Sequence, residues 1–248
     1  MTEERRQRID KLLVEKGLAK SRPQALRLIE AGLVEIAGKT ATKASQKFSV
    51  ETKILLTGDD PCRWVSRAGL KLEHAAAHFA LDFHGKTVLD IGASTGGFTE
   101  VALDGGAAHV YAVDVGMGQM DDSLRGLETV TVMEKTNARD LTMEMFDRVI
   151  DMVVCDASFI SLEKVLPAAL VIARQGAVLV ALIKPQFEAG KGNLGKGGIV
   201  KDESLQQQIC TDVTAFLEGA GWAVRGLTDS PIEGGDGNRE FLICAEKR

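Results

Sequence analysis

The feature that most constrains the fold is a glycine-rich turn that follows a short apolar segment. The segment runs from Thr87 to Ile91, and the turn reads Gly-Ala-Ser-Thr-Gly-Gly over residues 92–97. Asp90 lies within the segment, and Asp114 follows the next apolar segment along the chain. A strand, a glycine-rich turn into a helix, and an acidic residue after the next strand are typical of α/β domains that bind a nucleoside. In such domains the acidic residue accepts hydrogen bonds from ribose hydroxyls.

Apolar segments of strand length recur along the rest of the chain and alternate with helical patterns. The strongest show no polar–apolar alternation, which is typical of strands buried on both faces of a parallel sheet. We therefore expect an α/β fold: a Rossmann-like domain with a seven-stranded, mostly parallel sheet and its site at the carboxyl ends of the strands. The expected strands cover residues 87–91, 109–113, 130–133, 149–155, 177–183, 224–227 and 241–245.

The turn also restricts the identity of the ligand. A dinucleotide-binding turn has the pattern G-x-G-x-x-G, but Ser94 stands where its second glycine is required. Asp90 places negative charge where a pyrophosphate would lie, whereas that charge suits the cationic amino acid part of S-adenosylmethionine. We therefore favour S-adenosylmethionine over NAD. The residues expected to bind it in and after this turn are Asp90, Gly92, Ser94, Thr95, Gly96, Gly97, Phe98 and Asp114.

A second glycine-rich segment, residues 190–197, resembles a phosphate-binding P-loop. It satisfies G-x-x-x-x-G-K, but Gly197 stands where a P-loop needs Ser or Thr to hold magnesium. We interpret the segment as a basic loop whose Lys191 and Lys196 could contact a phosphate backbone. An ordinary surface loop is the alternative.

Charge is distributed unevenly along the chain. The formal net charge is −5, but residues 1–60 carry 12 basic and 9 acidic groups, a net charge of +3. Two short helices followed by two strands are expected here, with Leu26 and Ile29 facing the core. The basic side chains left facing solvent are Arg8, Arg22, Arg27, Lys39, Lys43 and Lys47. Phe48 is the only aromatic residue of this segment, so recognition would use phosphates and RNA shape rather than base stacking.

These N-terminal residues closely resemble the S4 RNA-binding domain. The resemblance rests on Arg8-Ile9-Asp10, Gly17-Leu18-Ala19, Ser21-Arg22, Gly32-x-Val34 and Gly38. It implies a small RNA-binding domain over residues 1–60, followed by a linker over residues 61–70. With Arg67, Lys191 and Lys196 added from the rest of the chain, Arg8, Arg22, Arg27, Lys39 and Lys43 form the expected RNA-binding set.

Four charged residues are expected to meet at one crevice. Asp156, Lys184 and Glu240 lie at strand ends, and Lys71 lies on the helix before the first strand. Methyl transfer needs an acceptor aligned with the methyl group, and a weakly acidic acceptor such as a ribose 2′-hydroxyl also needs a base. Repulsion between Lys71 and Lys184 would favour a neutral lysine that can act as the base, whereas the two carboxylates oppose this. A structural ion pair between Lys184 and Glu240 is the plain alternative.

The four residues resemble the Lys-Asp-Lys-Glu tetrad of FtsJ-like ribose 2′-O-methyltransferases. Together with the N-terminal domain, the chain resembles the TlyA family, also called haemolysin A. Its motifs appear as Ser66-Arg67-x-Gly69-Leu70-Lys71, Val113-Asp114-Val115-Gly116-x-Gly118-Gln119, Asp156-x-Ser158-Phe159 and Lys184-Pro185-Gln186-Phe187-Glu188. The resemblance implies an FtsJ-like domain over residues 71–248 that methylates a cytidine ribose of ribosomal RNA in ribosomal subunits. It also adds Asn137, Ala138 and Asp156 to the expected cofactor contacts.

Other classes of protein fit the sequence less well. No apolar run reaches the length of a membrane span, and the charged N-terminus is unlike a signal peptide, so we expect a cytoplasmic protein that does not act on membranes. The four cysteines form no C-x-x-C pair, and we expect no metal site. A haemolysin, or an RNA-binding protein with an NAD-binding or inactive Rossmann domain, is the alternative. Whether the chain forms a homodimer stays open.

Overall fold

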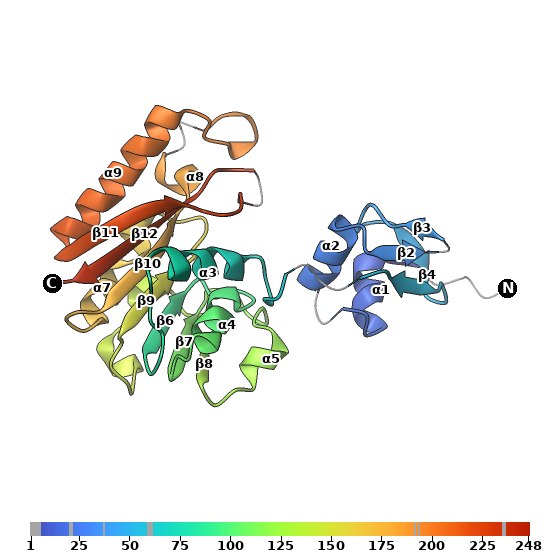
Figure 1. The fold of residues 1–248 in the computed structure, drawn as a ribbon, viewed down its shortest axis with the longest axis horizontal. Helices are drawn as coiled ribbons and strands as arrows, with labels where there is room; N and C mark the ends of the chain where they lie inside the picture. Colours follow the sequence, from blue (N-terminus) through green and yellow to red (C-terminus); the bar gives the residue numbers. More distant parts are fainter. Residues whose placement is uncertain are drawn as a thin grey trace. The chain divides into compact units, whose positions relative to one another are not determined.

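The computed structural model describes residues 6–19, 22–36, 38–58, 62–190, 192, 194–234 and 237–248 (Figure 1). The chain divides into two compact units, Met1–Ser66 and Arg67–Arg248, and each has its own hydrophobic core. The division falls within the linker expected at residues 61–70, and the limits of the two domains stay a prediction.

The smaller unit combines two short helices with short antiparallel strands. Its elements are β1 (Arg6–Arg8), α1 (Ile9–Glu15), α2 (Arg22–Glu30), β2 (Val34–Ile36), β3 (Lys39–Thr40), β4 (Lys47–Ser49) and β5 (Ile54–Leu56). β1 pairs with β4, and β2 lies between β3 and β5. Apolar side chains of both helices and of β2 form the core, among them Ile9, Leu12, Leu28 and Val34. β1, β3 and β4 were not expected, because they consist almost entirely of polar residues, whereas the equally short β2 and β5 carry apolar ones.

Helix α2 buries Ile29 as expected, but the rest of its buried face differs from the expectation. Leu26 is 38% exposed, whereas Arg27 is only 8% exposed and Leu28 is buried. The guanidinium of Arg27 donates hydrogen bonds to the backbone carbonyl oxygens of Val65 (3.2 Å) and Trp64 (3.3 Å). The expectation that Leu26 faces inward and Arg27 faces solvent was therefore wrong. The acceptors of Arg27 are distant in sequence, so helical periodicity could not reveal them.

One seven-stranded sheet organises the larger unit, in the order β11-β12-β10-β9-β6-β7-β8. The strands from β10 to β8 run parallel, and β12 is antiparallel to both of its neighbours. The expected seven-stranded, mostly parallel sheet is confirmed. The strands span Thr87–Ile91 (β6), His109–Val113 (β7), Val130–Met133 (β8), Met152–Cys155 (β9), Val178–Ile183 (β10), Trp222–Asp229 (β11) and Phe241–Lys247 (β12).

Helices cover both faces of this sheet (Figure 1). They are α3 (Ala68–His78), α4 (Gly97–Asp104), α5 (Asp122–Arg125), α6 (Leu162–Val165), α7 (Pro167–Ile172), α8 (Pro185–Glu188) and α9 (Glu203–Gly219), with short 3₁₀ turns between some of them. Leu89 and Ile91 of β6 pack in one core with side chains of α6, α7 and α9. Asp90 points to the opposite face, because side chains alternate along a strand, and there it contacts Thr99 of α4. In the parts of the chain that the structure describes, no helix is both long and apolar enough to cross a membrane.

Candidate active site

A cavity of about 430 Å³ opens at the carboxyl ends of β6, β7 and β9. The chain passes from β6 to β7 on one side and later enters β9 on the other side of β6, so the loops after these strands diverge here. Ligands of doubly wound sheets bind at such a switch point. The cavity therefore lies where the sequence predicts the site.

Most expected cofactor residues lie at or next to this cavity. Six border it: Gly92, Ser94, Asp114, Asn137, Ala138 and Asp156. The other five, which lie in β6, in the glycine-rich turn and at the start of α4, are not among the residues that border it: Asp90, Thr95, Gly96, Gly97 and Phe98. Which of the eleven contact a cofactor stays a prediction.

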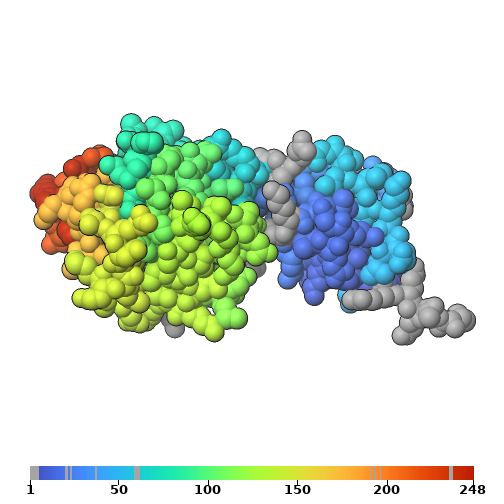
Figure 2. Space-filling model, turned by 90° about the horizontal axis from the view of Figure 1, so that it is seen from below, coloured from blue at the N-terminus to red at the C-terminus, as the bar shows by residue number. Residues whose placement is uncertain are grey.

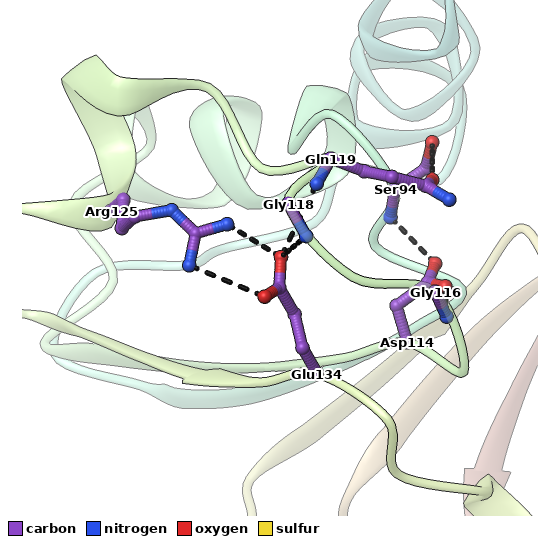
Figure 3. Close-up of polar contacts among 7 residues, drawn as sticks. All are labelled: Ser94, Asp114, Gly116, Gly118, Gln119, Arg125 and Glu134. Atoms are coloured by element: carbon purple, nitrogen blue, oxygen red, sulfur yellow. Dashed lines mark hydrogen bonds and ion pairs between the residues drawn. The ribbon is translucent and has the colours of Figure 1, made fainter.

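Asp114 follows β7 and organises two loops at the mouth of the cavity. Its Oδ2 accepts a hydrogen bond of 2.8 Å from the backbone N–H of Ser94, and its Oδ1 accepts one of 2.7 Å from the N–H of Gly116 (Figure 3). Each carboxylate oxygen can accept two hydrogen bonds, so both oxygens keep one for a ligand. Asp114 can thus hold the loops and still accept hydrogen bonds from ribose hydroxyls.

Asp90 is fully buried near the end of β6. Its Oδ2 accepts a hydrogen bond of 2.6 Å from the hydroxyl of Thr99. Its Oδ1 has no hydrogen-bond partner among the described residues. Burial raises the pKa of this carboxyl to about 7, and repulsion from Asp156 acts in the same direction.

The four expected catalytic residues form two ion pairs, of which the first is buried and the second is partly exposed at Asp156. Nζ of Lys71 on α3 lies 2.6 Å from Oε2 of Glu240, which precedes β12. Nζ of Lys184, directly after β10, lies 2.7 Å from Oδ1 of Asp156, directly after β9. Lys184 also donates hydrogen bonds to the hydroxyl of Ser158 (2.7 Å) and to the backbone oxygen of Asp156 (3.2 Å). No described group makes a well-oriented hydrogen bond to Oδ1 of Asp156, so its contact with Lys184 is an ion pair by distance alone.

This pairing differs from the plain alternative of an ion pair between Lys184 and Glu240. Each lysine instead faces a carboxylate from a different segment of the chain. The expected repulsion between Lys71 and Lys184 is therefore opposed by the negatively charged carboxylate that lies next to each lysine. The geometry brings Lys184 and Asp156 to the edge of the cavity, since Asp156 and Ser158 both border it.

Some residues that border the cavity were not expected to contact the cofactor. Ser158 holds Lys184, and Gln119 and Thr136 come from the loops after β7 and β8. Phe159 is 90% exposed and has a positive φ of 66°, which is rare for a non-glycine residue. Ser158, Phe159 and Gln119 lie within motifs quoted above, which was the available signal, whereas Thr136 lies in none of them. Periodicity assigns no direction to the side chains of loop residues.

The expected RNA-binding side chains of the smaller unit have different environments. Arg8 and Arg22 both form ion pairs with the buried carboxylate of Asp10, at 2.9 Å and 2.8 Å. Lys39 and Lys43 are exposed, as is Arg67 at the start of the larger unit, whereas Arg27 is buried. Of the basic loop, Lys191 and the side chain of Lys196 lie outside the described residues. The RNA-binding set as a whole stays a prediction.

Cysteine and metal chemistry find little support in the described residues. Cys155 is buried in the core, as its alternation with Asp156 predicts, and burial raises the pKa of its thiol to about 12. A nucleophilic cysteine needs the opposite shift. No group of three or more potential metal ligands occurs among the residues that the structure describes.

Comparison with known families fits this geometry. The family model of FtsJ-like methyltransferases matches residues 64–247, and that of the S4 domain matches residues 7–54. The chain belongs to the FtsJ-like methyltransferases. The first match contains the whole seven-stranded sheet and the cavity, and the second contains both helices of the smaller unit.

Relatives over nearly the full length refine this assignment. The chain is 48% identical over 239 residues to the 16S/23S rRNA (cytidine-2′-O)-methyltransferase TlyA of Mycobacterium tuberculosis, covering 96% of this chain and 89% of that protein. It is 39% identical over 236 residues to Hemolysin A of Brachyspira hyodysenteriae, covering 95% and 98%. The structure of a candidate hemolysin from Streptococcus thermophilus superposes with a TM-score of 0.79 at 44% identity, covering 98% and 89%. This FtsJ-like methyltransferase is thus a member of the TlyA family, and the resemblance noted in the sequence is confirmed.

Proposed function

We propose that the protein is an S-adenosylmethionine-dependent methyltransferase that modifies the 2′-hydroxyl of a cytidine in ribosomal RNA. The observation that carries this proposal is the contact of Lys184 with Asp156 at the edge of a nucleoside-sized cavity at the strand ends. The family and the name of the relative from Mycobacterium tuberculosis support the choice of substrate.

The residues at the cavity fit S-adenosylmethionine. Asp114 keeps hydrogen-bond acceptors for ribose hydroxyls, and Asn137 and Ala138 border the same cavity. The unpartnered Oδ1 of buried Asp90 suits a cationic group, which the amino acid part of the cofactor carries. The cofactor supplies an electrophilic methyl group on a sulfonium ion.

Lys184 is the residue we propose to accept the proton of the 2′-hydroxyl, in its neutral form, after the proton of its ion pair with Asp156 has left the amine. Asp156 and Ser158 hold its Nζ from two sides, so the amine has one fixed position at the cavity edge. Lys71 and Glu240 neutralise each other in a second, buried pair, and neither is among the residues that border the cavity. Alignment of acceptor and methyl group supplies much of the rate, and proton removal completes the transfer.

The smaller unit supplies RNA affinity in this proposal. Its exposed lysines and the outward-facing edges of Arg8 and Arg22 offer donors to phosphates, and its family match is to an RNA-binding domain. Work on ribosomal subunits implies that the protein acts in the cytoplasm.

The test is methyl transfer from labelled S-adenosylmethionine to purified ribosomal subunits. A 2′-O-methylated nucleotide survives alkaline hydrolysis because the attacking hydroxyl is blocked, so the label should remain in an alkali-resistant dinucleotide that contains cytidine. Label in alkali-sensitive nucleotides would indicate base methylation and would contradict the proposal. Calorimetry with S-adenosylmethionine and NAD in parallel tests the cofactor, and binding of NAD alone would favour the alternative of an NAD-binding domain.

A further inference from the structure

A carboxylate outside the cavity-bordering residues holds one of the cavity loops. Glu134 directly follows β8, the edge strand of the sheet. Its Oε1 accepts hydrogen bonds from the backbone N–H groups of Gly118 (2.8 Å) and Gln119 (3.3 Å). Both of its oxygens also face the guanidinium of Arg125 on α5 (Figure 3). Glu134 therefore fixes the backbone of the loop that connects β7 to α5.

The loop that Glu134 holds is a wall of the cavity. Gln119 borders the cavity, and its Oε1 accepts a hydrogen bond of 3.0 Å from the hydroxyl of Ser94 in the glycine-rich turn. A Cβ on Gly116 would lie only 2.3 Å from Nε2 of Gln119, so the amide occupies the space that this glycine leaves open. The Gln119 side chain thus connects the loop after β7 to the loop after β6.

Two carboxylates at neighbouring strand ends restrain this loop from opposite sides. Asp114 binds the N–H group of Gly116 at one end of the loop and that of Ser94 in the glycine-rich turn. Glu134 binds the N–H groups of Gly118 and Gln119 further along the loop (Figure 3). Asp114 also borders the cavity, whereas Glu134 is not among the residues that do. An influence of Glu134 on a ligand must therefore pass through the loop.

The restraint is present at neutral pH. Hydrogen bonds from Arg125 and then from Gly118 lower the pKa of Glu134 to about 2, so the carboxylate is ionised at neutral pH.

Figure 2 shows that one face of the larger unit is a continuous surface of the segment coloured green to yellow-green, which includes α5 and β8. The side chains of Arg125 and Glu134 are 36% and 18% exposed. The pair can accordingly be changed without opening the core.

We propose that Glu134 is a positioning residue for the cofactor, which acts by holding Gln119 against Ser94 before the cofactor binds. The proposal rests on the proposed function in one respect, namely that the cavity binds S-adenosylmethionine. Without Glu134 the loop must be ordered at the moment of binding, and that ordering reduces affinity. Contacts with the reacting groups stay intact, so the chemical step should not change.

Calorimetry with S-adenosylmethionine tests the proposal on the full-length protein. Glu134→Ala should raise the dissociation constant about tenfold, the scale of a lost hydrogen bond to a charged group. Glu134→Gln retains an acceptor oxygen and should have a smaller effect. Glu246→Ala is the matched control, because Glu246 of β12 forms an exposed ion pair with Arg225 away from the cavity, and it should bind the cofactor like the wild type.

Two further measurements separate positioning from general destabilisation. In the methylation assay, Glu134→Ala should raise KM for S-adenosylmethionine and leave kcat at saturating cofactor unchanged. In a Gln119→Ala background, Glu134→Ala should change the dissociation constant by less than about twofold, because the side chain it positions is absent. Wild-type affinity in Glu134→Ala, or independent effects of the two substitutions, would overturn the proposal. Failure of the wild type to bind S-adenosylmethionine would instead refute the proposed function, and this inference with it.

Discussion

Carboxylates at the ends of four neighbouring parallel strands differ in their surroundings, and the surroundings determine what each can do. Asp90 near the end of β6 is buried with one hydroxyl partner, and Asp114 after β7 accepts backbone N–H groups. Asp156 after β9 faces a lysine, and Glu134 after β8 faces an arginine. Carboxylates at or near the ends of neighbouring strands thus yield a titrating group, a ligand acceptor and two ion-pair partners.

The first prediction at the residue scale concerns Lys184. Lys184→Ala should lower kcat for rRNA methylation by about 10²- to 10⁴-fold, the usual contribution of a general base, and should leave cofactor affinity within about threefold of the wild type. Single-turnover methylation and calorimetry measure the two quantities. Lys164→Ala, which changes an exposed lysine on α6, is the control and should have wild-type activity. A folded Lys184→Ala protein with full activity would refute the role of Lys184 as the base.

The second residue-scale prediction concerns the pH dependence of stability. Burial raises the pKa of Asp90 from 3.8 to about 7, so the ionised form opposes folding. The stabilisation that the protonated carboxyl of Asp90 adds to the free energy of unfolding is therefore fully present below about pH 4. It is lost as the pH rises through about 7. Asp90→Asn does not titrate, so relative to the wild type it should gain up to about 4 kcal/mol between these limits.

Chemical denaturation at several pH values without cofactor measures this difference. Asp82→Asn, which changes an exposed carboxylate, is the control and should follow the wild-type curve. Parallel curves for Asp90→Asn and the wild type would show that Asp90 has an ordinary pKa.

At the scale of elements, strands were more predictable than helix faces. The expected spans of β6, β7 and β8 agree with the structure. Every residue of β6 and β7 is buried, as expected for strands covered on both faces, whereas β8 is the edge strand and only Val130 is buried. The prediction that Arg27 of α2 faces solvent was wrong, because its hydrogen-bond partners come from residues 64 and 65. Glu134 was missed because no local pattern shows that a residue after an edge strand turns toward another loop.

The element-scale prediction concerns the turn after β6. Gly92 has a φ of 78°, and a Cβ there would lie 2.9 Å from the Cα of Ala157. A positive φ alone costs a residue other than glycine roughly 1–2 kcal/mol, and Gly92→Ala should destabilise the fold by more than this. It should also displace the loop that carries Asp156. Gly85→Ala is the matched control, because Gly85 also has a positive φ of 67° but has nothing within 4 Å of its Cβ.

Denaturant unfolding measures the destabilisation, and calorimetry with S-adenosylmethionine measures how the displaced loop changes cofactor affinity. Gly85→Ala should show only the cost of the backbone conformation and should retain cofactor affinity. Equal destabilisation by the two substitutions would mean that the approach of Gly92 to Ala157 is unimportant.

At the scale of the whole molecule, two units with separate cores divide the proposed work. The smaller unit carries exposed lysines and two arginines held by Asp10, and the larger unit carries the cavity and both lysine–carboxylate pairs. Changes to exposed charges of the smaller unit should therefore affect RNA binding and leave cofactor binding unaltered.

The corresponding prediction uses Lys39 and Lys43. Replacing both by Ala should weaken binding to rRNA and reduce the slope of log K against log salt concentration by about 1 for each phosphate that the protein no longer neutralises. Titrations of ribosomal subunits at several salt concentrations measure the slope, and calorimetry should show unchanged affinity for S-adenosylmethionine. Lys164→Ala serves again as the control. A wild-type slope for the double variant would exclude these two lysines from the RNA interface.

The sequence by itself determined the class of the fold, the strands of the sheet and the residues that end them, because burial on two faces and glycine-rich turns leave local patterns. It also predicted that Lys71, Asp156, Lys184 and Glu240 meet at one crevice, and the structure pairs them two by two. Only the tertiary structure decided which lysine pairs with which carboxylate, that Arg27 is buried, and that Glu134 holds the loop of Gln119. These contacts join segments far apart in the chain, and their geometry depends on strand order and loop conformation, which no local pattern encodes.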